Sequence, residues 1–466
     1  MENASPEVAV IQMYEARKEI YPREIAGRYA SLRWFFVWLT QLIFYGFPWL
    51  EWNGRQAVLF DLGARKFYIF GIVLWPQDFI YLAALLIICA YSLFLFTAIF
   101  GRVWCGFACP QSVYTEIFLW FERKIEGDRS ARMRLDRQPM SVEKLSRKTA
   151  KHTVWAMFAL WTGFSFVGYF TPIRELAHEI TVMSLGPWEW FWVLFYSFAT
   201  YGNAGWMREQ VCKYMCPYAR FQSAMFDKDS LIITYDVERG EPRGARSKSN
   251  PDAGKQLGDC IDCSMCVQVC PTGIDIRKGL QYECIGCGAC VDACNSVMDK
   301  IGASRGLVRF WTDHAMKYRW SSKQILSHMF RPRVLIYSAI LLVIVTVFFG
   351  TLLTRTPLKM DVIRDRGSMG REVEDGKIEN VYRLQIMNTS EESHAYRLSV
   401  GGIDTLHVQG HSEIVLGPTE SRAVPVSVRV DEGKGEKGSN KIYFTLTTID
   451  NPEVMVKEKA VFFVPR

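Results

Sequence analysis

Eight cysteines in the middle of the chain follow one spacing twice. The first run is Cys260-x2-Cys263-x2-Cys266-x3-Cys270-Pro271, and the second is Cys284-x2-Cys287-x2-Cys290-x3-Cys294. Such a run lets one loop reach three corners of a [4Fe–4S] cube, while its fourth cysteine ligates the neighbouring cube. A pair of zinc sites of the CxxC type is the alternative, which the doubled pattern disfavours. The spacing therefore predicts two [4Fe–4S] clusters, one on Cys260, Cys263, Cys266 and Cys294 and the other on Cys284, Cys287, Cys290 and Cys270.

A shorter cysteine pattern also occurs twice, as Cys105-x3-Cys109-Pro110 and as Cys212-x3-Cys216-Pro217. If a helix continues through each motif, its two cysteines share one face with Cβ atoms about 5–6 Å apart, and the proline then breaks that helix. The two pairs predict either one four-thiolate site or two dithiol sites. Thiolates at this spacing suit Cu(I), a further iron–sulfur cluster or a redox-active dithiol. The alternative is that these cysteines are small buried residues at the ends of apolar segments.

Other candidate residues carry weaker signals. Cys89 stands alone within an apolar stretch, which favours packing against lipid or a helix. His178 and Met183 could touch copper, and His152 lies at the edge of an apolar stretch, but surface and interface positions explain all three. No histidine falls inside the apolar stretches and no C-x-x-C-H occurs, which argues against haem. No Gly-rich fingerprint for a nucleotide cofactor is present.

Five apolar stretches are long enough, or nearly so, to cross a bilayer, which needs about 20 residues. They cover residues 34–50, 79–100, 154–173, 190–206 and 334–354. Residues 57–75 are also apolar but are interrupted by Asp61, Arg65 and Lys66, which predicts an interfacial or re-entrant piece rather than a sixth span. Lysine and arginine are dense in residues 101–153, which places that loop, the N-terminus and residues 207–333 in the cytoplasm. Five spans then place the C-terminus outside.

The predicted fold class is a multi-domain membrane protein, and the 466-residue chain is too long for one compact core. Residues 1–33 form a cytoplasmic segment without signal-peptide character. Residues 34–206 hold transmembrane helices 1–4 of an α-helical bundle with the cytoplasmic loop 101–153, and residues 334–354 form transmembrane helix 5. Between them, cytoplasmic residues 207–333 include a bacterial-ferredoxin-like domain at about 251–300. The net charge of +7 is explained by cytoplasmic loops rather than by nucleic-acid binding.

The last part of the chain, residues 355–466, changes character and contains no cysteine. Residues 381–386, 396–400, 423–430 and 442–447 alternate apolar and polar side chains, as half-buried strands do. Turn residues such as Gly401-Gly402 and Gly417-Pro418 separate these stretches. This pattern predicts a small antiparallel β-sandwich, immunoglobulin-like in size and strand count.

With both cysteine patterns and the β-domain together, the chain resembles the CcoG family, also called FixG or RdxA, over nearly its whole length. The resemblance includes residues 60–75, 104–111, 212–226, 235–244 and the cluster region. It implies a bacterial inner-membrane protein, with its clusters in the cytoplasm and its C-terminal domain in the periplasm, that reduces Cu(II) to Cu(I) during biogenesis of cytochrome cbb3 oxidase. The expected partners are copper ions, copper-delivery proteins and cbb3 oxidase assembly proteins. The candidate catalytic and copper-binding residues are Cys105, Cys109, Cys212 and Cys216.

Two other interpretations remain open. Membrane ferredoxins of the NapH type share the C-x3-C-P pairs and paired clusters, which would make this chain a quinol-linked electron-transfer subunit without a copper substrate. Alternatively, the clusters report redox state while the β-domain recruits assembly partners, as in a sensor or scaffold. Neither the electron donor nor direct contact between copper and the C-x3-C-P cysteines follows from the sequence.

Overall fold

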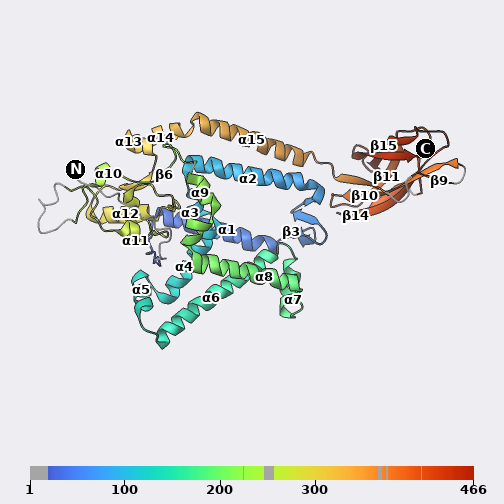
Figure 1. Ribbon diagram of the computed structural model, residues 1–466. Helices are drawn as coiled ribbons and strands as arrows, with labels where there is room; N and C mark the ends of the chain where they lie inside the picture. The colour runs from blue at the N-terminus through green and yellow to red at the C-terminus, as the bar shows by residue number, and fades with distance from the viewer. Residues whose placement is uncertain are drawn as a thin grey trace, which may run out of the picture. The chain divides into compact units, whose positions relative to one another are not determined.

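The computed structural model describes residues 19–223, 225–245, 257–365, 370–373, 376–410 and 412–465. The chain divides into two compact units. The first comprises residues 1–46, 89–167 and 178–341, and the second comprises residues 47–88, 168–177 and 342–466. The cysteine motifs all lie in the first unit, and the C-terminal β-domain lies in the second. Figure 1 shows the helices and strands of both.

Helices make up most of the first unit. α6 packs against α8, where a Cβ atom on Gly163 would lie 2.4 Å from the Val193 carbonyl oxygen, so only glycine permits this approach. α8 continues directly into the π-helix η3 (Tyr201–Met207). The longer helices here are α1 (Arg28–Gly46), α4 (Pro110–Glu126), α5 (Arg129–Arg137), α6 (Val142–Val167), α8 (Pro187–Thr200), α12 (Ala289–Ile301) and α14 (Ser322–Met329). The shorter ones are α3 (Val103–Phe107), η4 (Val211–Met215), α9 (Pro217–Ser223), α10 (Val237–Gly240), α11 (Met265–Gln268), η6 (Ile276–Lys278) and α13 (Asp313–Lys317).

Two helices among the described residues are long and apolar enough to cross a membrane by length and composition, Pro76–Phe100 and Pro332–Leu353. They contain α2 (Phe79–Phe100) and α15 (Pro332–Leu353), the second and fifth predicted spans. Tyr91 of α2 contacts Tyr337 of α15 in the first unit, and Tyr81 contacts Phe348 in the second. The other three predicted spans are helical over most of their length, in α1, α6 and α8 with η3. Their crossing of a membrane stays a prediction.

Residues 57–75 form strands and no membrane-spanning helix, in agreement with the preference for an interfacial or re-entrant piece over a sixth span. Their position relative to a membrane stays a prediction. They fold into a three-stranded antiparallel sheet of β3 (Val58–Asp61), β4 (Lys66–Ile69) and β5 (Ile72–Leu74). The interrupting charges lie at the hairpin turn, where Asp61 pairs in register with Lys66. Arg65 in this turn has a positive φ of 56°. Before this sheet lie η1 (Phe47–Trp49) and the short ladder of β1 (Glu51–Trp52) and β2 (Arg55–Gln56), and after it lies η2 (Pro76–Asp78).

The C-terminal domain is a two-sheet β-sandwich, as predicted. One sheet has the order β12 (His407–Gln409), β14 (Ser421–Val430), β10 (Ile378–Asn388) and β8 (Leu358–Arg364), with β9 (Arg371–Glu372) also on β10. The other has the order β13 (Glu413–Leu416), β11 (His394–Gly401), β15 (Gly438–Thr448) and β16 (Met455–Val464). Alternate side chains of both sheets, including Tyr382, Leu384, Phe444 and Phe462, form one buried core. The four predicted strands lie inside β10, β11, β14 and β15.

Candidate metal centres

The first run of cysteines lines a cavity beside a small β-ladder. β6 (Ile232–Tyr235) pairs with β7 (Val308–Trp311), and α11 and α12 pack nearby. The backbone turns tightly at Asp262 and Ser264, which both have positive φ values. Tyr235 and Leu307 contribute to the apolar wall of the cavity. Its thiols are the four predicted for one cluster, Cys260, Cys263, Cys266 and Cys294.

The second run lines a separate cavity, walled by Ile233 and Ile276. Left-handed backbone at Gly286 (φ 67°) and Gly288 (φ 73°) lets the loop curl around this space. The cavity is lined by the four thiols predicted for the other cluster, Cys270, Cys284, Cys287 and Cys290, and Cys266 reaches both cavities. The fold therefore brings together the two crossed sets of thiols that the spacing predicted.

The donor set at each cavity fits a [4Fe–4S] cluster, because the four thiols predicted for each cluster line one cavity and such clusters are held by four cysteine thiolates. Among the described residues, no three His, Cys, Asp or Glu side chains are close enough to hold one metal ion. Burial raises the pKa of Cys266 to about 11 and the pKa of both Cys284 and Cys294 to about 12. Iron binding must therefore displace protons from these thiols.

The two C-x3-C-P motifs adopt matching local structures, and in neither does one helix continue through the motif. α3 ends before Cys109, and η4 ends before Cys216. Both cysteines have extended backbone, with ψ values of 129° and 111°. Each precedes a proline, and proline disfavours helical geometry in the residue before it. The prolines then begin α4 and α9, so each motif is a short helical turn, an extended cysteine and a new helix.

The four cysteines of these motifs lie close together and are called the thiol quartet below: Cys105, Cys109, Cys212 and Cys216. Burial, followed by the nearby Cys109 and Cys216 thiols, raises the pKa of Cys105 to about 11, although Arg102 opposes this rise. Burial, followed by Cys109 and Cys105, raises the pKa of Cys212 to about 12. Because the thiols of each motif influence the pKa of a thiol in the other, the four cysteines lie near one another. Among the described residues, no three of them are close enough to hold one metal ion, so one four-thiol site and two dithiol sites both stay predictions.

The thiol quartet packs directly against the loop of the second cavity. A Cβ atom on Gly106 would lie 2.7 Å from the Cys287 Cα atom and 2.8 Å from its backbone nitrogen, so the two backbones are in contact. Cys105 shares a buried cluster with Ile285 and Cys287, and Cys212 packs against that cluster. The thiol quartet and the second cavity are therefore adjacent.

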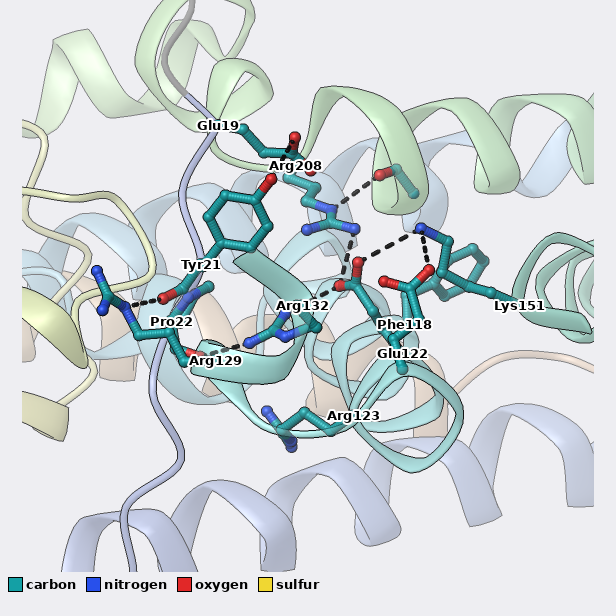
Figure 2. A network of polar contacts seen from close by, with 12 residues as sticks. Glu19, Tyr21, Pro22, Phe118, Glu122, Arg123, Arg129, Arg132, Lys151 and Arg208 are labelled. Atoms are coloured by element: carbon teal, nitrogen blue, oxygen red, sulfur yellow. Dashed lines mark hydrogen bonds and ion pairs between the residues drawn. The ribbon is translucent and has the colours of Figure 1, made fainter. Parts of the chain in front are cut away.

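A buried ionic network joins the segments that carry the two motifs. Glu122 lies on α4, which begins just after Cys109, and Arg208 lies four residues before Cys212. Figure 2 shows Arg208, Arg132 and Lys151 around the Glu122 carboxylate. The arginines bind one of its oxygens at 3.1 Å, and the Lys151 ammonium lies 3.5 Å from the other.

Burial alone would raise the pKa of Glu122, but Arg208, Arg132 and Lys151 outweigh that effect and hold the pKa below its usual value. The carboxylate is therefore ionised and can compensate the surrounding cations. Gln111 adds a second link between the segments, because its side-chain NH₂ donates to the backbone oxygens of Asn203 at 2.9 Å and Arg208 at 3.1 Å. The motif patterns did not single out Glu122 or Arg208. The only feature in the sequence that could have indicated Glu122 and Arg208 is that each is a charged residue next to an apolar stretch.

The weaker candidates do not join these sites. Cys89 is exposed on α2, as expected for a residue facing lipid or another helix. The His152 Nδ1 atom lies 2.8 Å from the Tyr201 hydroxyl, and its ring stacks on Trp206. His178 is exposed on α7 (Ile173–Thr181), and Met183 is 75% exposed. In the part of the chain that the structure describes, no metal-binding group of His, Cys, Asp or Glu side chains includes His178.

Three family sequence models match the chain. The "4Fe-4S dicluster domain" covers residues 207–313, the "4Fe-4S binding domain" covers residues 82–127, and the "IG-like fold at C-terminal of FixG" covers residues 348–465. The first match contains all eight ferredoxin-type cysteines and Cys212 and Cys216, and the second contains Cys105 and Cys109. The predicted iron–sulfur and immunoglobulin-like domains are therefore confirmed at the level of the domain.

Three named relatives also align with most of the chain. "Nitrogen fixation protein FixG" of Rhizobium meliloti is 37% identical over 94% of this chain and 91% of its own length. "Protein RdxB" of Cereibacter sphaeroides is 38% identical over 92% of each chain, and "Protein RdxA" of the same organism is 39% identical over 84% of each. The crystal structure of a FixG-related protein from Vibrio parahaemolyticus is 29% identical and covers 23% of this chain and 96% of its own, with a TM-score of 0.22.

Proposed function

The chain belongs to the family of FixG, RdxA and RdxB, and we propose on this basis that it is a membrane-bound iron–sulfur cupric reductase. In this proposal, two [4Fe–4S] clusters occupy the two thiol-lined cavities with the ligand sets predicted from the sequence. The thiol quartet binds copper and is where Cu(II) becomes Cu(I). The product serves assembly of a cbb3-type cytochrome c oxidase, with copper-delivery and oxidase assembly proteins as partners.

The observation that carries the copper proposal is the contact of the thiol quartet with the second cavity, through Gly106 and Cys287. Soft thiolates prefer Cu(I), whereas Cu(II) prefers nitrogen and oxygen ligands. The thiol quartet therefore favours the reduced ion and also retains it after reduction. A [4Fe–4S] cluster, when bound, would supply the single electron that each Cu(II) needs.

The proposed location is the bacterial inner membrane, with five spans, cytoplasmic clusters and a periplasmic β-domain. Large apolar side chains are exposed on all five helices in question, and such surfaces need lipid around them. Examples are Leu42 on α1, Leu86 on α2, Met157 on α6, Phe198 on α8 and Leu342 on α15.

Replacing all four cysteines of the thiol quartet with serine tests the proposal. The protein, purified without oxygen, should keep its iron, acid-labile sulfide and cluster absorbance but lose reduction of Cu(II), followed with a Cu(I)-specific chelator. Cys89→Ser is the matched control, because Cys89 lies outside every site, and this variant should reduce copper at the wild-type rate. Reduction at the wild-type rate by the quartet variant would refute the assignment.

A second candidate function is a quinol-linked electron-transfer subunit. It is favoured by the match of a 4Fe–4S binding domain to residues 82–127, because this match contains Cys105 and Cys109 and raises the prospect of a third cluster on the thiol quartet. The iron content distinguishes the candidates, at about eight iron atoms per chain for two [4Fe–4S] clusters and about twelve for three. Cluster reduction by a quinol in proteoliposomes, without copper, would support this second function.

A further inference from the structure

Arg102 is a buried cation at the junction of the thiol quartet and the second cavity. It directly precedes α3, and its residue is only 6% exposed. One terminal nitrogen of its guanidinium donates to the Tyr282 backbone oxygen, in the loop that leads to Cys284. A Cβ atom on Gly286 would lie 3.1 Å from the Arg102 carbonyl group, so this loop and Arg102 are in contact. Arg102 therefore contacts the backbone of the loop that carries the second cavity and directly adjoins the helix that carries Cys105.

Arg102 lacks the compensation that other buried arginines here possess. Arg132 and Arg208 both pair with Glu122. In the described ranges, no aspartate or glutamate forms an ion pair with Arg102, and its buried Nε atom has no hydrogen-bond partner. A buried charge without an opposite charge is costly. Within the described part of the chain, the group that compensates Arg102 is therefore not a carboxylate.

The groups around Arg102 that can become anions are thiols. Arg102 directly precedes α3, which carries Cys105, and its guanidinium bonds the Tyr282 oxygen two residues before Cys284. Its carbonyl group also contacts Gly286, next to Cys287. The same cation thus lies beside a segment of the thiol quartet and beside the loop that carries predicted ligands of the second cluster. These thiols supply the missing negative charge once a metal has displaced their protons.

We propose that Arg102 is the counter-cation shared by the thiol quartet and the second cluster. The proposal rests on the proposed function, because it takes the quartet to bind copper through thiolates. Cu(I) held by two thiolates carries one net negative charge, which a nearby cation stabilises strongly in a medium of low dielectric. For each ion reduced, one electron leaves the cluster side and Cu(II) becomes Cu(I). The negative charge on the cluster side therefore decreases as the negative charge at the copper site increases. Arg102 lies beside both sites and can stabilise either charge without moving.

The test uses the full chain, purified without oxygen with its clusters, and three substitutions. Arg102→Gln removes the charge, whereas Arg102→Lys keeps it. Arg331→Gln is the matched control, because Arg331 is also largely buried, binds the Ala98 carbonyl oxygen near the same end of α2 and pairs with Asp227. Iron and acid-labile sulfide are counted first. The midpoint potential of each cluster is then measured by EPR-monitored redox titration, and Cu(I) affinity by competition with a Cu(I)-specific chelator.

Arg102→Gln should weaken Cu(I) binding by about tenfold or more and shift one cluster midpoint to a more negative value, because an added electron is then less stabilised. Arg102→Lys and Arg331→Gln should stay near the wild type in both measurements. The proposal is overturned if Arg102→Gln keeps both wild-type values, or if Arg331→Gln changes them equally. If Arg102→Gln fails to retain iron, Arg102→Lys decides, since wild-type values support the charge and shifted values refute it.

These outcomes are separable from failure of the proposed function. If the wild type reduces no Cu(II) but the Arg102→Gln midpoint still shifts, the copper function fails and the role of Arg102 at the cluster stands. If the wild type reduces Cu(II) and Arg102→Gln matches it in midpoint and affinity, the function stands and the role of Arg102 fails.

Discussion

At the scale of single residues, the buried charges around the C-x3-C-P motifs are of two kinds, one compensated by opposite charges and one without a carboxylate partner among the described residues. Glu122 is compensated by Arg132, Arg208 and Lys151, and this network ties α4 to the segment before Cys212. Arg102 has no carboxylate partner among the described residues and lies between α3, which carries Cys105, and the loop before Cys284. The first arrangement holds the motif segments together without metal, whereas the second is completed only when the thiols are ionised.

Replacing Glu122 with glutamine should destabilise the protein, because it leaves Arg132 and Arg208 buried without a carboxylate. Breaking a buried ion pair in this way costs about 3–5 kcal/mol, which should appear as a lower melting temperature of the detergent-purified protein at pH 7. Glu143→Gln is the control, since its pair with Arg147 is 65% and 43% exposed and is worth less than about 1 kcal/mol. Equal melting temperatures for the two variants would contradict the prediction.

The pH dependence of this effect has a definite sign. The pKa of Glu122 in the folded protein is held below its usual value, chiefly because Arg208, Arg132 and Lys151 outweigh the effect of burial. Its stabilising contribution is therefore complete above the unfolded pKa of about 4.3 and is lost as the pH falls through the lower folded value. The difference in melting temperature between wild type and Glu122→Gln should accordingly be constant from pH 8 to pH 6 and shrink in more acidic buffer.

The sequence predicts the cysteines better than their charged neighbours, and the reason is physical. Ligand spacing within a ferredoxin run is local, so Cys260, Cys263 and Cys266 can be recognised without knowledge of the fold. The pairing of Glu122 with Arg208 joins residues 86 positions apart, and no local pattern encodes it. Arg102 is adjacent to a motif, but its significance lies in the absence of a carboxylate partner among the described residues, which only the fold reveals.

At the scale of elements, strands were predictable where one face is buried and the other is polar. β10, β11, β14 and β15 show this alternation clearly. β16 was missed because Lys457, Glu458 and Lys459 are consecutive charged residues that interrupt it, and β12 has only three residues. In the C-x3-C-P motifs, the proline effect on the preceding cysteine prevailed over helix continuation, so the two cysteines of each pair do not share one helical face.

The alternation within β15 yields a stability prediction for the β-domain. Phe444 is fully buried in the sandwich core and contacts Tyr382, whereas the adjacent Tyr443 points to the other face and is 37% exposed. In a fragment of residues 356–466, Phe444→Ala should lower the free energy of unfolding by about 3–5 kcal/mol. Tyr443→Ala should change it by about 0.5 kcal/mol or less. Urea unfolding measures both, and similar losses at the two positions would show that the burial pattern is wrong.

At the scale of the whole molecule, the order of segments followed from composition, but the number of membrane crossings did not. α2 and α15 are apolar throughout and are recognised as candidate spans by length and composition. α6 begins with Lys144, Arg147, Lys148 and Lys151 before its apolar half, and α8 reaches sufficient length only through η3. Residues 57–75 differ, because their apolar composition resembles that of a membrane segment although they form a β-sheet. The charged residues within this stretch lie in a turn of that sheet.

The five-span topology makes a prediction that a two-span topology does not. With five spans, position 183 lies outside, between the third and fourth crossings. If only α2 and α15 cross, it lies on the same side as residues 101–153.

A cysteine introduced at Met183, which is 75% exposed, should therefore react with a membrane-impermeant maleimide in intact spheroplasts if the chain has five spans. A cysteine introduced at exposed Glu436 in the β-domain should also react, whereas one at exposed Ser141 should react only after permeabilisation. Labelling at position 436 without labelling at 183 would leave two crossings and place α6 and α8 on the cytoplasmic side. The native cysteines do not obscure this result, because the topology places the twelve motif cysteines in the cytoplasm and Cys89 within a span, so intact wild-type cells should show no labelling.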